Sequence, residues 1–249
     1  MGARRLWSGP QWVTLAGVDD PSFFDVVTTT RAIRRYRPDP VPEDDLARML
    51  FVASRAPSGS NRQPFRFLVL RDGPHATEAR RVLGESFRSM WAAKRAADGY
   101  DAGSGAEADT PKARMAATMQ HFVDHVEDVP VVVLACYRRH RAPHPNEGAS
   151  VYPACQNLLL AARALGYGGV LTIWHAAVEA EVAAVLDIPD DVVIAATLTL
   201  GRPVGHHGPV RRRPLSELVY EDRWGEAPAW AVDPPGTRFT SAGPPRGPR

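Results

Sequence analysis

The sequence predicts a single sheet flanked by helices, of the α/β or α+β class, and three observations lead to this prediction. About four short apolar runs have the length of strands, while longer segments between them repeat apolar residues at helical spacing. The helices and strands alternate irregularly along the chain. Hydrophobic residues make up 44% and charged residues 23% of the 249 residues, which is the composition of a folded globular protein and excludes wholesale disorder.

These helical and strand patterns occupy residues 21–224, which we expect to form one domain. Residues 1–20 are a mixed leader without an apolar signal core. Residues 225–249 hold six prolines and four glycines, a composition that favours an extended tail.

Local signals define the elements in the first half of this domain. Pro21 after Asp20 predicts a helix that Asp20 caps, and the acidic run 43–45 favours the first turn of a second helix. The Gly/Ala/Asp-rich stretch 99–109, which we expect to be mobile, separates two longer helices. The predicted elements are a helix to Thr30, a helix from Pro42, a strand at Phe65–Leu70, and helices at 76–98 and 111–127.

Buried strands and a glycine-ended helix define the second half. Three consecutive valines, 131–133, mark a buried strand, and Gly166 ends a helix with one apolar stripe. The predicted elements are strands at Pro130–Tyr137, Val170–Ile173 and Val192–Leu200, a helix at Ala149–Leu165, and a helix that ends at Asp187.

Charge and cysteine content exclude several classes of protein. The net charge of +2 is too small to indicate a nucleic-acid partner, and no apolar run approaches the roughly 20 residues of a membrane span. Cys136 and Cys155 lie in apolar patterns and are expected to pack in the core, in a reducing compartment. His121 and His125 lack the glutamate of a zincin motif, so we expect no metal site. We expect a cytoplasmic protein with no membrane partner.

Two arginine motifs predict anion binding. In the segment 31–36, Arg31 and Arg35 are four residues apart, so a helical backbone would place both on one face, where they can clasp a phosphate. Arg211 and Arg213 would point one way in an extended segment and add positive charge. The alternative for each motif is a solvated basic surface.

A breaker-rich loop precedes the first predicted strand. Gln63 stands before Pro64 and is therefore biased toward extended geometry, which would place Asn61 and Gln63 on the same side. Two neutral amides suit the polar edge of a heteroaromatic ring, and the alternative is an ordinary turn.

In this order, the segments resemble the FMN-dependent nitroreductase family over about residues 22–224. The likeness comprises the arginine pair, the P-S-x-x-N-x-Q-P loop at 57–64, the glycine-ended helix Tyr152–Gly166, the L-x-I-P turn at 186–189, the strand that closes at Gly201 and the terminal R-x-R-P at 211–214.

The resemblance implies an α+β sandwich with a central mixed sheet flanked by helices, and an intertwined homodimer that binds FMN at its interface. Arg31, Arg35, Arg211 and Arg213 would hold the phosphate and ribityl chain. The implied cofactor-binding residues are Arg31, Ala32, Ile33, Arg35, Pro57, Ser58, Gly59, Asn61, Gln63, Leu171, Thr172, Ile173, Arg211 and Arg213, with 57–59 coming from the partner subunit and 171–173 facing flavin N5.

The implied activity is ping-pong hydride transfer from NADH or NADPH, through flavin N5, to a nitroaromatic, a quinone or another electron-poor small molecule. Because the flavin carries this chemistry, no catalytic side chain is expected. The alternatives are a flavin-consuming or reductive-dehalogenating member of the same fold, or a non-catalytic regulator that binds flavin. A serine common in the family's first motif is absent here, where Ala32 and Ile33 stand. Trp174 stands where many relatives have an acidic residue, and the two alternatives for it are that it narrows the acceptor pocket or that it packs in the core.

The resemblance further implies that Arg35 supplies positive charge near the N1/C2 carbonyl edge and stabilises the anionic reduced flavin. Helical geometry predicts that Arg34, which does not share the face of Arg31 and Arg35, tolerates alanine.

Overall fold

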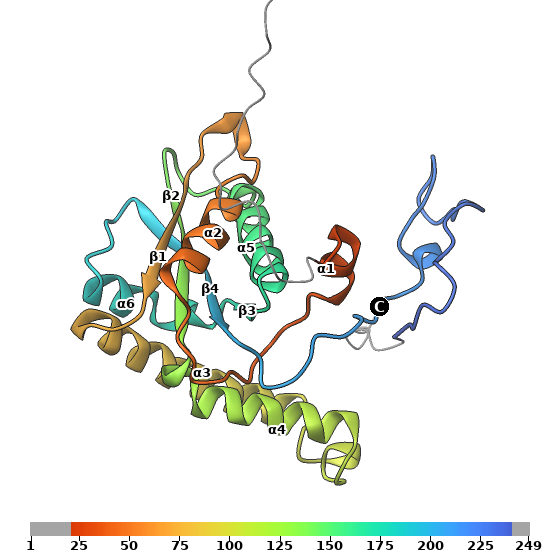
Figure 1. Ribbon diagram of the computed structural model, residues 1–249, viewed down its shortest axis with the longest axis horizontal. Coiled ribbons are helices and arrows are strands. Elements are labelled where there is room, and N and C mark those ends of the chain that lie inside the picture. The colour runs from red at the N-terminus through yellow and green to blue at the C-terminus, as the bar shows by residue number, and fades with distance from the viewer. Residues whose placement is uncertain (1–20, 241–249) are drawn as a thin grey trace, which may run out of the picture. The chain divides into compact units, whose positions relative to one another are not determined.

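The computed structural model describes residues 21–240 as two units, 21–206 and 207–240, and each unit is described by itself. The first unit is built around a four-stranded sheet with the strand order β1-β2-β4-β3 (Figure 1). Its strands are β1 Phe65–Leu70, β2 Val131–Arg138, β3 Gly168–Thr172 and β4 Val192–Gly201, and all four lie within two residues of the predicted bounds.

Each neighbouring pair of these strands is antiparallel. Phe65 lies opposite Tyr137, Tyr137 opposite Val193, and Gly169 opposite Leu200. Within residues 21–206, one parallel bridge joins Ala32 to Gly169 at the outer edge of β3. The four-stranded sheet is therefore antiparallel, with one parallel bridge at its edge, rather than the mixed sheet that the resemblance implies, because β4 inserts between the codirectional strands β2 and β3 and runs opposite to both.

Helices cover both faces of the sheet, which confirms the α+β class. In β2, Val131, Val133 and Ala135 pack with α2 and α5, whereas Val132 and Leu134 pack with α3, α4 and α6 on the other face. This alternation follows from the two-residue repeat of a strand. The helices are α2 Glu43–Ala53 and α5 Tyr152–Ala164 on the first face, and α3 Pro74–Ala97, α4 Pro111–Asp124 and α6 Glu179–Val185 on the second.

The remaining helix, α1 Phe23–Thr29, begins later than predicted. The side chain of Ser22 accepts a hydrogen bond from the Asp25 amide and caps the helix, so Pro21 precedes the cap and Asp20 lies outside the described residues. Three segments at the ends of predicted helices are 3₁₀ turns instead, η4 Val126–Asp128, η5 Glu147–Ser150 and η6 Trp174–Val178. The other 3₁₀ turns lie outside the predicted helices and are η2 Gly59–Asn61, η3 Gly103–Gly105 and η7 Leu215–Glu217. Within residues 21–240, no helix has the length and apolar composition to cross a membrane.

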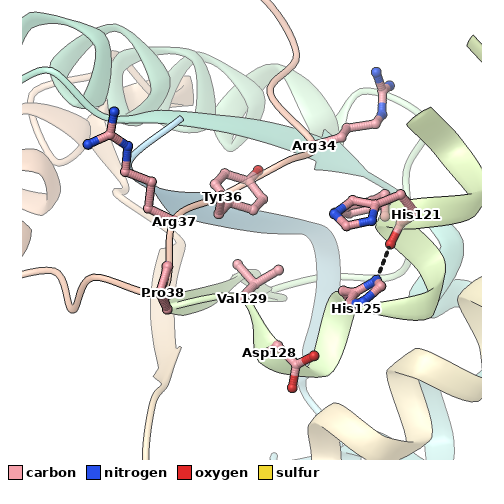
Figure 2. Close-up of a pocket in the computed structure, with 9 residues that line it drawn as sticks. Arg34, Tyr36, Arg37, Pro38, His121, His125, Asp128 and Val129 are labelled. Carbon is pink, nitrogen blue, oxygen red and sulfur yellow. Dashed lines mark hydrogen bonds between the residues drawn. The ribbon is translucent and has the colours of Figure 1, made fainter. Parts of the chain in front are cut away.

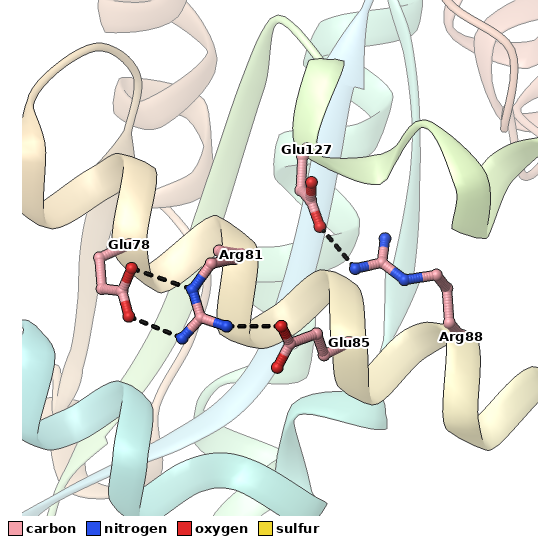
Figure 3. A network of polar contacts seen from close by, with 5 residues as sticks. All are labelled: Glu78, Arg81, Glu85, Arg88 and Glu127. Atoms are coloured by element: carbon pink, nitrogen blue, oxygen red, sulfur yellow. Dashed lines mark hydrogen bonds and ion pairs between the residues drawn. The ribbon is translucent and has the colours of Figure 1, made fainter.

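Arginines of α3 hold the turn between α4 and β2. The guanidinium of buried Arg80 donates to the carbonyls of Leu70 (2.6 Å), Glu127 (3.1 Å) and Val129 (2.7 Å). Arg88 pairs with the Glu127 carboxylate at 2.8 Å, next to the pairs that Arg81 makes with two glutamates of α3 (Figure 3). Exposed pairs contribute little to stability, so the buried Arg80 contacts stabilise this turn most.

The second unit has little core of its own. Among residues 207–240, Ala231 is the one hydrophobic side chain that is buried, and Trp224 is 90% exposed. A bridge between Arg212 and Phe239 and a hydrogen bond from the Leu215 amide to Asp233 (3.0 Å) tie this unit together. The division into a leader, a domain at 21–224 and a tail stays a prediction.

His175 is a buried titratable side chain between η6 and β4. It is 2% exposed, and its Nε2 lies 2.7 Å from the Ile194 carbonyl, which can only accept a hydrogen bond. Nε2 therefore carries the proton, and Nδ1 faces the Thr197 hydroxyl at 3.1 Å. Burial lowers the pKa of His175, since a charged imidazole would lose its hydration.

We predict that His175 makes the fold sensitive to mild acid. Because its pKa is lower in the folded state, the unfolded chain takes up a proton first, so stability is complete above about pH 6.5 and falls as the pH drops below it. Urea unfolding at pH 7.5, 6.5 and 5.5 should show a steeper loss of stability in the wild type than in His175→Gln. His140→Gln, which changes an exposed histidine, is the control. Equal slopes for the wild type and His175→Gln would contradict the prediction.

Candidate functional site

The arginine segment is extended rather than helical. After α1, Ala32 bridges to Gly169 and Tyr36 bridges to Pro203, and the Ile33 amide donates to the Gly169 carbonyl at 2.9 Å. The backbone of Arg35 accepts from the Val204 amide at 3.1 Å. The helical-face argument for Arg31 and Arg35 is therefore wrong, because the free edge of β3 and the chain after β4 take up the backbone groups that a helix would have used.

Tyr36 fixes this segment to the sheet. Its hydroxyl lies 2.8 Å from the Thr199 hydroxyl of β4 and donates to the Ile33 carbonyl. Burial raises the pKa of Tyr36, so the phenol is neutral at physiological pH. The segment 31–37 is thus held at a defined position along β3 and β4.

The cations of this segment have no acidic partner. Neither a hydrogen bond nor an ion pair joins the guanidinium of Arg31, Arg34, Arg35 or Arg37 to a carboxylate of residues 21–240. Arg34 is half-buried, and burial, together with the nearby charge of Arg31, lowers its pKa. An arginine keeps its charge in proteins, so this segment presents positive charge that a ligand can neutralise.

A cavity of about 290 Å³ lies beside this segment. Three residues predicted to face a flavin, Leu171, Thr172 and Ile173, line it together with Arg34 and Trp174. Val170 and the α4 residues Met119 and Phe122 complete its walls. The structure therefore brings the arginine segment and the segment 171–173 together, with Arg34 rather than Arg35 in the wall.

A second cavity, of about 170 Å³, adjoins the first, since Arg34 and Phe122 line both. His121 and His125 of α4 stack here with ring centroids 4.3 Å apart, and His125 Nδ1 contacts the His121 carbonyl (Figure 2). Arg37 points away from these histidines (Figure 2). Burial lowers the pKa of His121, and the nearby His125 and Arg35 lower it further.

The loop before β1 is folded back on itself. Ser60, Asn61 and Gln63 have φ angles of 52°, 51° and 50°, so the predicted extended geometry is wrong. The cause is the Ser58 hydroxyl, which accepts a hydrogen bond from the backbone N–H of Gln63 at 2.9 Å and so closes the turn. The two amide side chains nevertheless meet, with Gln63 Nε2 donating to Asn61 Oδ1 at 3.1 Å. Left-handed backbone at non-glycine residues costs about 1 kcal/mol or more each, and such strain clusters at functional sites.

One subunit does not bring this loop to the arginine segment. The loop ends at Phe65, which lies opposite Tyr137 of β2, and Tyr137 in turn lies opposite Val193 of β4. The arginine segment pairs with Gly169 of β3, which lies opposite Leu200 of β4. Seven residues of β4 separate these positions, roughly 23 Å at 3.3 Å per residue. The loop and the segment thus lie at opposite ends of the sheet (Figure 1).

Other predicted site residues lie in the second unit. Arg211 and Arg213 are exposed, and Arg213 is 3.8 Å from Glu217. Their role toward an anion stays a prediction.

Sequence reasoning missed four wall residues, Arg34, Met119, Phe122 and Val170. Arg34 could have been found from the sequence if the segment had been read as extended. Alternate residues of an extended chain point to the same side, so Arg34 points to the same side as the partly buried Tyr36. The two α4 residues are ordinary helical apolar positions, which no local pattern distinguishes from core.

Comparison with known proteins adds independent evidence. A sequence profile described as the Nitroreductase family matches residues 27–202. A 5,6-dimethylbenzimidazole synthase of Rhodospirillum rubrum is 30% identical over 213 residues, which cover 80% of this chain and 89% of that protein. A NADH dehydrogenase of Thermus thermophilus is 29% identical over 76% of this chain and 90% of its own length. The solved NADPH:FMN oxidoreductase of Vibrio harveyi, in complex with NAD⁺, superimposes with a TM-score of 0.58 at 18% identity, covering 82% of this chain and 78% of that one.

Proposed function

The chain belongs to the nitroreductase family, and from that premise we propose that it is an oxidoreductase that binds FMN and transfers hydride from NADH or NADPH to a nitroaromatic, a quinone or another electron-poor acceptor. The observation that carries this proposal is the cavity that joins unpaired Arg34 to Leu171, Thr172 and Ile173. It offers positive charge beside apolar walls, which suits a planar ring that gains negative charge on reduction.

The residues present fit an FMN phosphate as well as a ring. In an extended chain, Arg31, Ile33 and Arg35 share one side, while Ala32 and Arg34 share the other. Arg31 and Arg35 can therefore still bind one phosphate, although not for the helical reason. Each charge-assisted contact contributes roughly 1.5–3 kcal/mol. Arg34, on the inner side with Tyr36, is then free to face the ring.

The chain's own residues would bind and orient the cofactor. Bound FMN would supply the hydride chemistry, accepting from NAD(P)H and giving to the acceptor. Arg34 would stabilise negative charge on the ring, and Leu171, Ile173 and Trp174 would keep water from it. We assign no side chain as an acid or base, because bound FMN would carry the chemistry.

A homodimer would complete the site. The loop with Pro57, Ser58, Gly59, Asn61 and Gln63 lies at the far end of the sheet in its own subunit, so a second subunit must supply it if it contacts the same flavin. A surface for this association exists. The large hydrophobic residues Phe23, Phe24, Val27, Phe51 and Val52 of α1 and α2 are exposed, with Phe23 at 70% and Phe24 at 76%.

A second candidate is the activity for which the Rhodospirillum rubrum relative is named, the synthesis of 5,6-dimethylbenzimidazole. The match over 80% of this chain favours it. Chromatography against authentic 5,6-dimethylbenzimidazole would distinguish it, and a flavin that is consumed would not regain its colour when an acceptor is added.

We predict that the purified protein is yellow and shows the absorbance bands of oxidised FMN. Anaerobic NADH or NADPH should bleach these bands, and 1,4-benzoquinone should restore them, because the quinone accepts the hydride and the cofactor is recycled. The measurement is a visible spectrum before and after each addition. A colourless protein that cannot be reconstituted with FMN would rule out the proposed function.

Substitutions in the arginine segment should separate phosphate binding from ring binding. Arg35→Ala should weaken binding of FMN roughly ten- to a hundredfold but leave riboflavin, which has no phosphate, unchanged. Arg34→Ala should weaken both ligands, because its guanidinium faces the ring. Titration of the apoproteins by flavin fluorescence measures both affinities.

Arg37→Ala is the matched control for these substitutions, since Arg37 is exposed and points away from the histidines of the second cavity (Figure 2). If Arg37→Ala weakens FMN binding as much as Arg34→Ala, general positive charge binds the flavin, and the assignment of Arg34 to the ring is incorrect.

We predict a dimer in solution, because several large hydrophobic side chains of α1 and α2 are exposed and the proposed site needs the loop at 57–63 from a second copy. Light scattering should give a mass of about twice 27.2 kDa. Phe24→Asp should shift the protein toward monomer and lower its FMN content together, whereas Met90→Asp, at an exposed apolar side chain of α3, should do neither. A stable monomer that binds FMN fully would contradict this prediction.

A further inference from the structure

A cavity of about 370 Å³ lies at the end of the sheet where β1 begins and β2 ends, and cationic side chains surround it. Within residues 21–240, no carboxylate lines this cationic cavity. A smaller cavity of about 180 Å³ adjoins it, because the two share part of their walls. The basic residues that line the cationic cavity are Arg62, Arg66, Arg138, Arg139 and His140.

The pairing of β1 with β2 brings two of these arginines together. Arg66 lies opposite Cys136, and Arg138 follows Cys136 by two residues, so Arg66 and Arg138 lie on the same face of the sheet. The Arg138 amide donates to the Pro64 carbonyl at 2.9 Å, which extends the pairing to the edge of the cavity. Diagonal neighbours of this kind are within reach of long side chains, so one ligand can contact both guanidinium groups.

Two of the four arginines are neutralised within the fold. Arg138 pairs with Asp191 at 2.7 Å, and Arg139 pairs with Glu147 at 3.1 Å. The hydrogen bond from Arg139 lowers the pKa of Glu147, so this carboxylate stays charged at neutral pH. The uncompensated positive charge of the cavity therefore belongs to the other two arginines.

Arg66 and Arg62 have no acidic partner. The Arg66 guanidinium donates to the carbonyls of Gln63 (2.9 Å) and Phe65 (2.8 Å), which hold it in place without neutralising it. No hydrogen bond or ion pair joins the Arg62 guanidinium to another residue within 21–240. Both side chains are exposed, so a ligand from solution can reach them.

Two uncompensated guanidinium groups beside one cavity favour a doubly charged ligand. A single carboxylate would neutralise one of them, whereas a phosphate monoester carries nearly two negative charges at neutral pH and three terminal oxygens. The planar fork of arginine matches these oxygens with paired hydrogen bonds. A neutral ligand would leave the charges of Arg62 and Arg66 as they are.

We propose that the cationic cavity binds a phosphate monoester, with Arg62 and Arg66 as its counter-charges. Gln63 belongs both to the wall of this cavity and to the loop that the proposed dimer brings to the flavin of the other subunit. A donor whose nicotinamide lies against that flavin extends its adenosine away from the ring. The favoured source of the phosphate is therefore the 2′-phosphate of NADPH, which NADH lacks, and this assignment of the source rests on the proposed function. Free inorganic phosphate is the other source.

The first test compares adenosine 2′-monophosphate with adenosine, which differ by the phosphate. Calorimetric titration is done with excess FMN present, so that the arginine segment 31–37 is already occupied. The monophosphate should bind on the order of tenfold more tightly, the scale of one charge-assisted contact. The difference should shrink as salt is raised from 50 to 500 mM, since screening weakens the attraction. Equal affinities would overturn the proposal.

Substitutions locate the site. Arg62→Ala and Arg66→Ala should each weaken binding of the monophosphate about tenfold and change binding of adenosine less than about twofold. Arg66 also holds two carbonyls of the loop, but the Arg62 side chain has no such contact, so Arg62→Ala tests the charge without disturbing the backbone. Arg71→Ala is the matched control, because it removes one positive charge just beyond the far end of β1, where Arg71 pairs with Glu43 at 3.1 Å.

Two results of these titrations would overturn the proposal. One is an unchanged affinity for the monophosphate in both Arg62→Ala and Arg66→Ala. The other is an equal loss in Arg71→Ala, which would show that the general charge of the surface attracts the ligand.

Coenzyme kinetics distinguish the two sources of phosphate. With 1,4-benzoquinone as acceptor, kcat/KM for NADPH should exceed that for NADH on the order of tenfold, and Arg62→Ala should reduce this ratio. Equal use of NADPH and NADH would overturn the assignment to NADPH, and displacement of the monophosphate by inorganic phosphate would then identify free phosphate as the source. A protein that oxidises neither coenzyme but binds the monophosphate through Arg62 would count against the proposed function and leave the phosphate site in place.

Discussion

The candidate site depends on the backbone pairing between the arginine segment and the outer edge of β3. This pairing needs a glycine at position 169, because a Cβ there would lie 2.5 Å from the Thr199 carbonyl and 2.8 Å from Leu200. With Gly169 in place, β3 lies close to β4, and its free edge accepts the Ile33 amide. Tyr36 then anchors the segment to Thr199. The positions of Arg31, Arg34 and Arg35 all follow from this contact.

The distribution of charge shows why this segment, among many arginines, marks a site. On α3, Arg81, Arg88 and Arg95 each face a carboxylate, so their charges are neutralised within the fold. The segment 31–37 has no such partners among the described residues, although burial already lowers the pKa of Arg34. Desolvating a cation without a counter-ion costs free energy, and a bound anion or electron-rich ring recovers that free energy. Composition alone does not distinguish arginines that have a carboxylate partner from those that have none. The ion pairs of the structure do.

Local signals predicted the strands well and the site's backbone poorly, for one physical reason. β1 and β4 are apolar runs closed by Pro64 and Gly201, so their bounds follow from neighbours in sequence. The segment Arg31–Tyr36 fits either a helical or an extended repeat, and the edge of β3, some 135 residues later, decides between them. Gln63 likewise departs from the geometry that Pro64 favours because the Ser58 hydroxyl captures its amide. Where the hydrogen-bond partner of a backbone group is distant in sequence or is a side chain, the local sequence pattern cannot decide between alternative backbone conformations.

If the loop before β1 and the arginine segment contact one flavin, as we propose, the strand order explains why one chain would not make a whole site. An antiparallel sheet with the order β1-β2-β4-β3 places the start of β1 and the start of β3 at opposite ends. The strained loop before β1 and the cationic segment beside β3 are therefore separated by the length of β4, however the side chains rotate. The strained residues Ser60, Asn61 and Gln63 therefore do not reach the arginine segment 31–37 of their own chain. In the homodimer that we propose, a two-fold axis that brings the end of one sheet to the opposite end of another would unite the two elements in each of two equivalent sites.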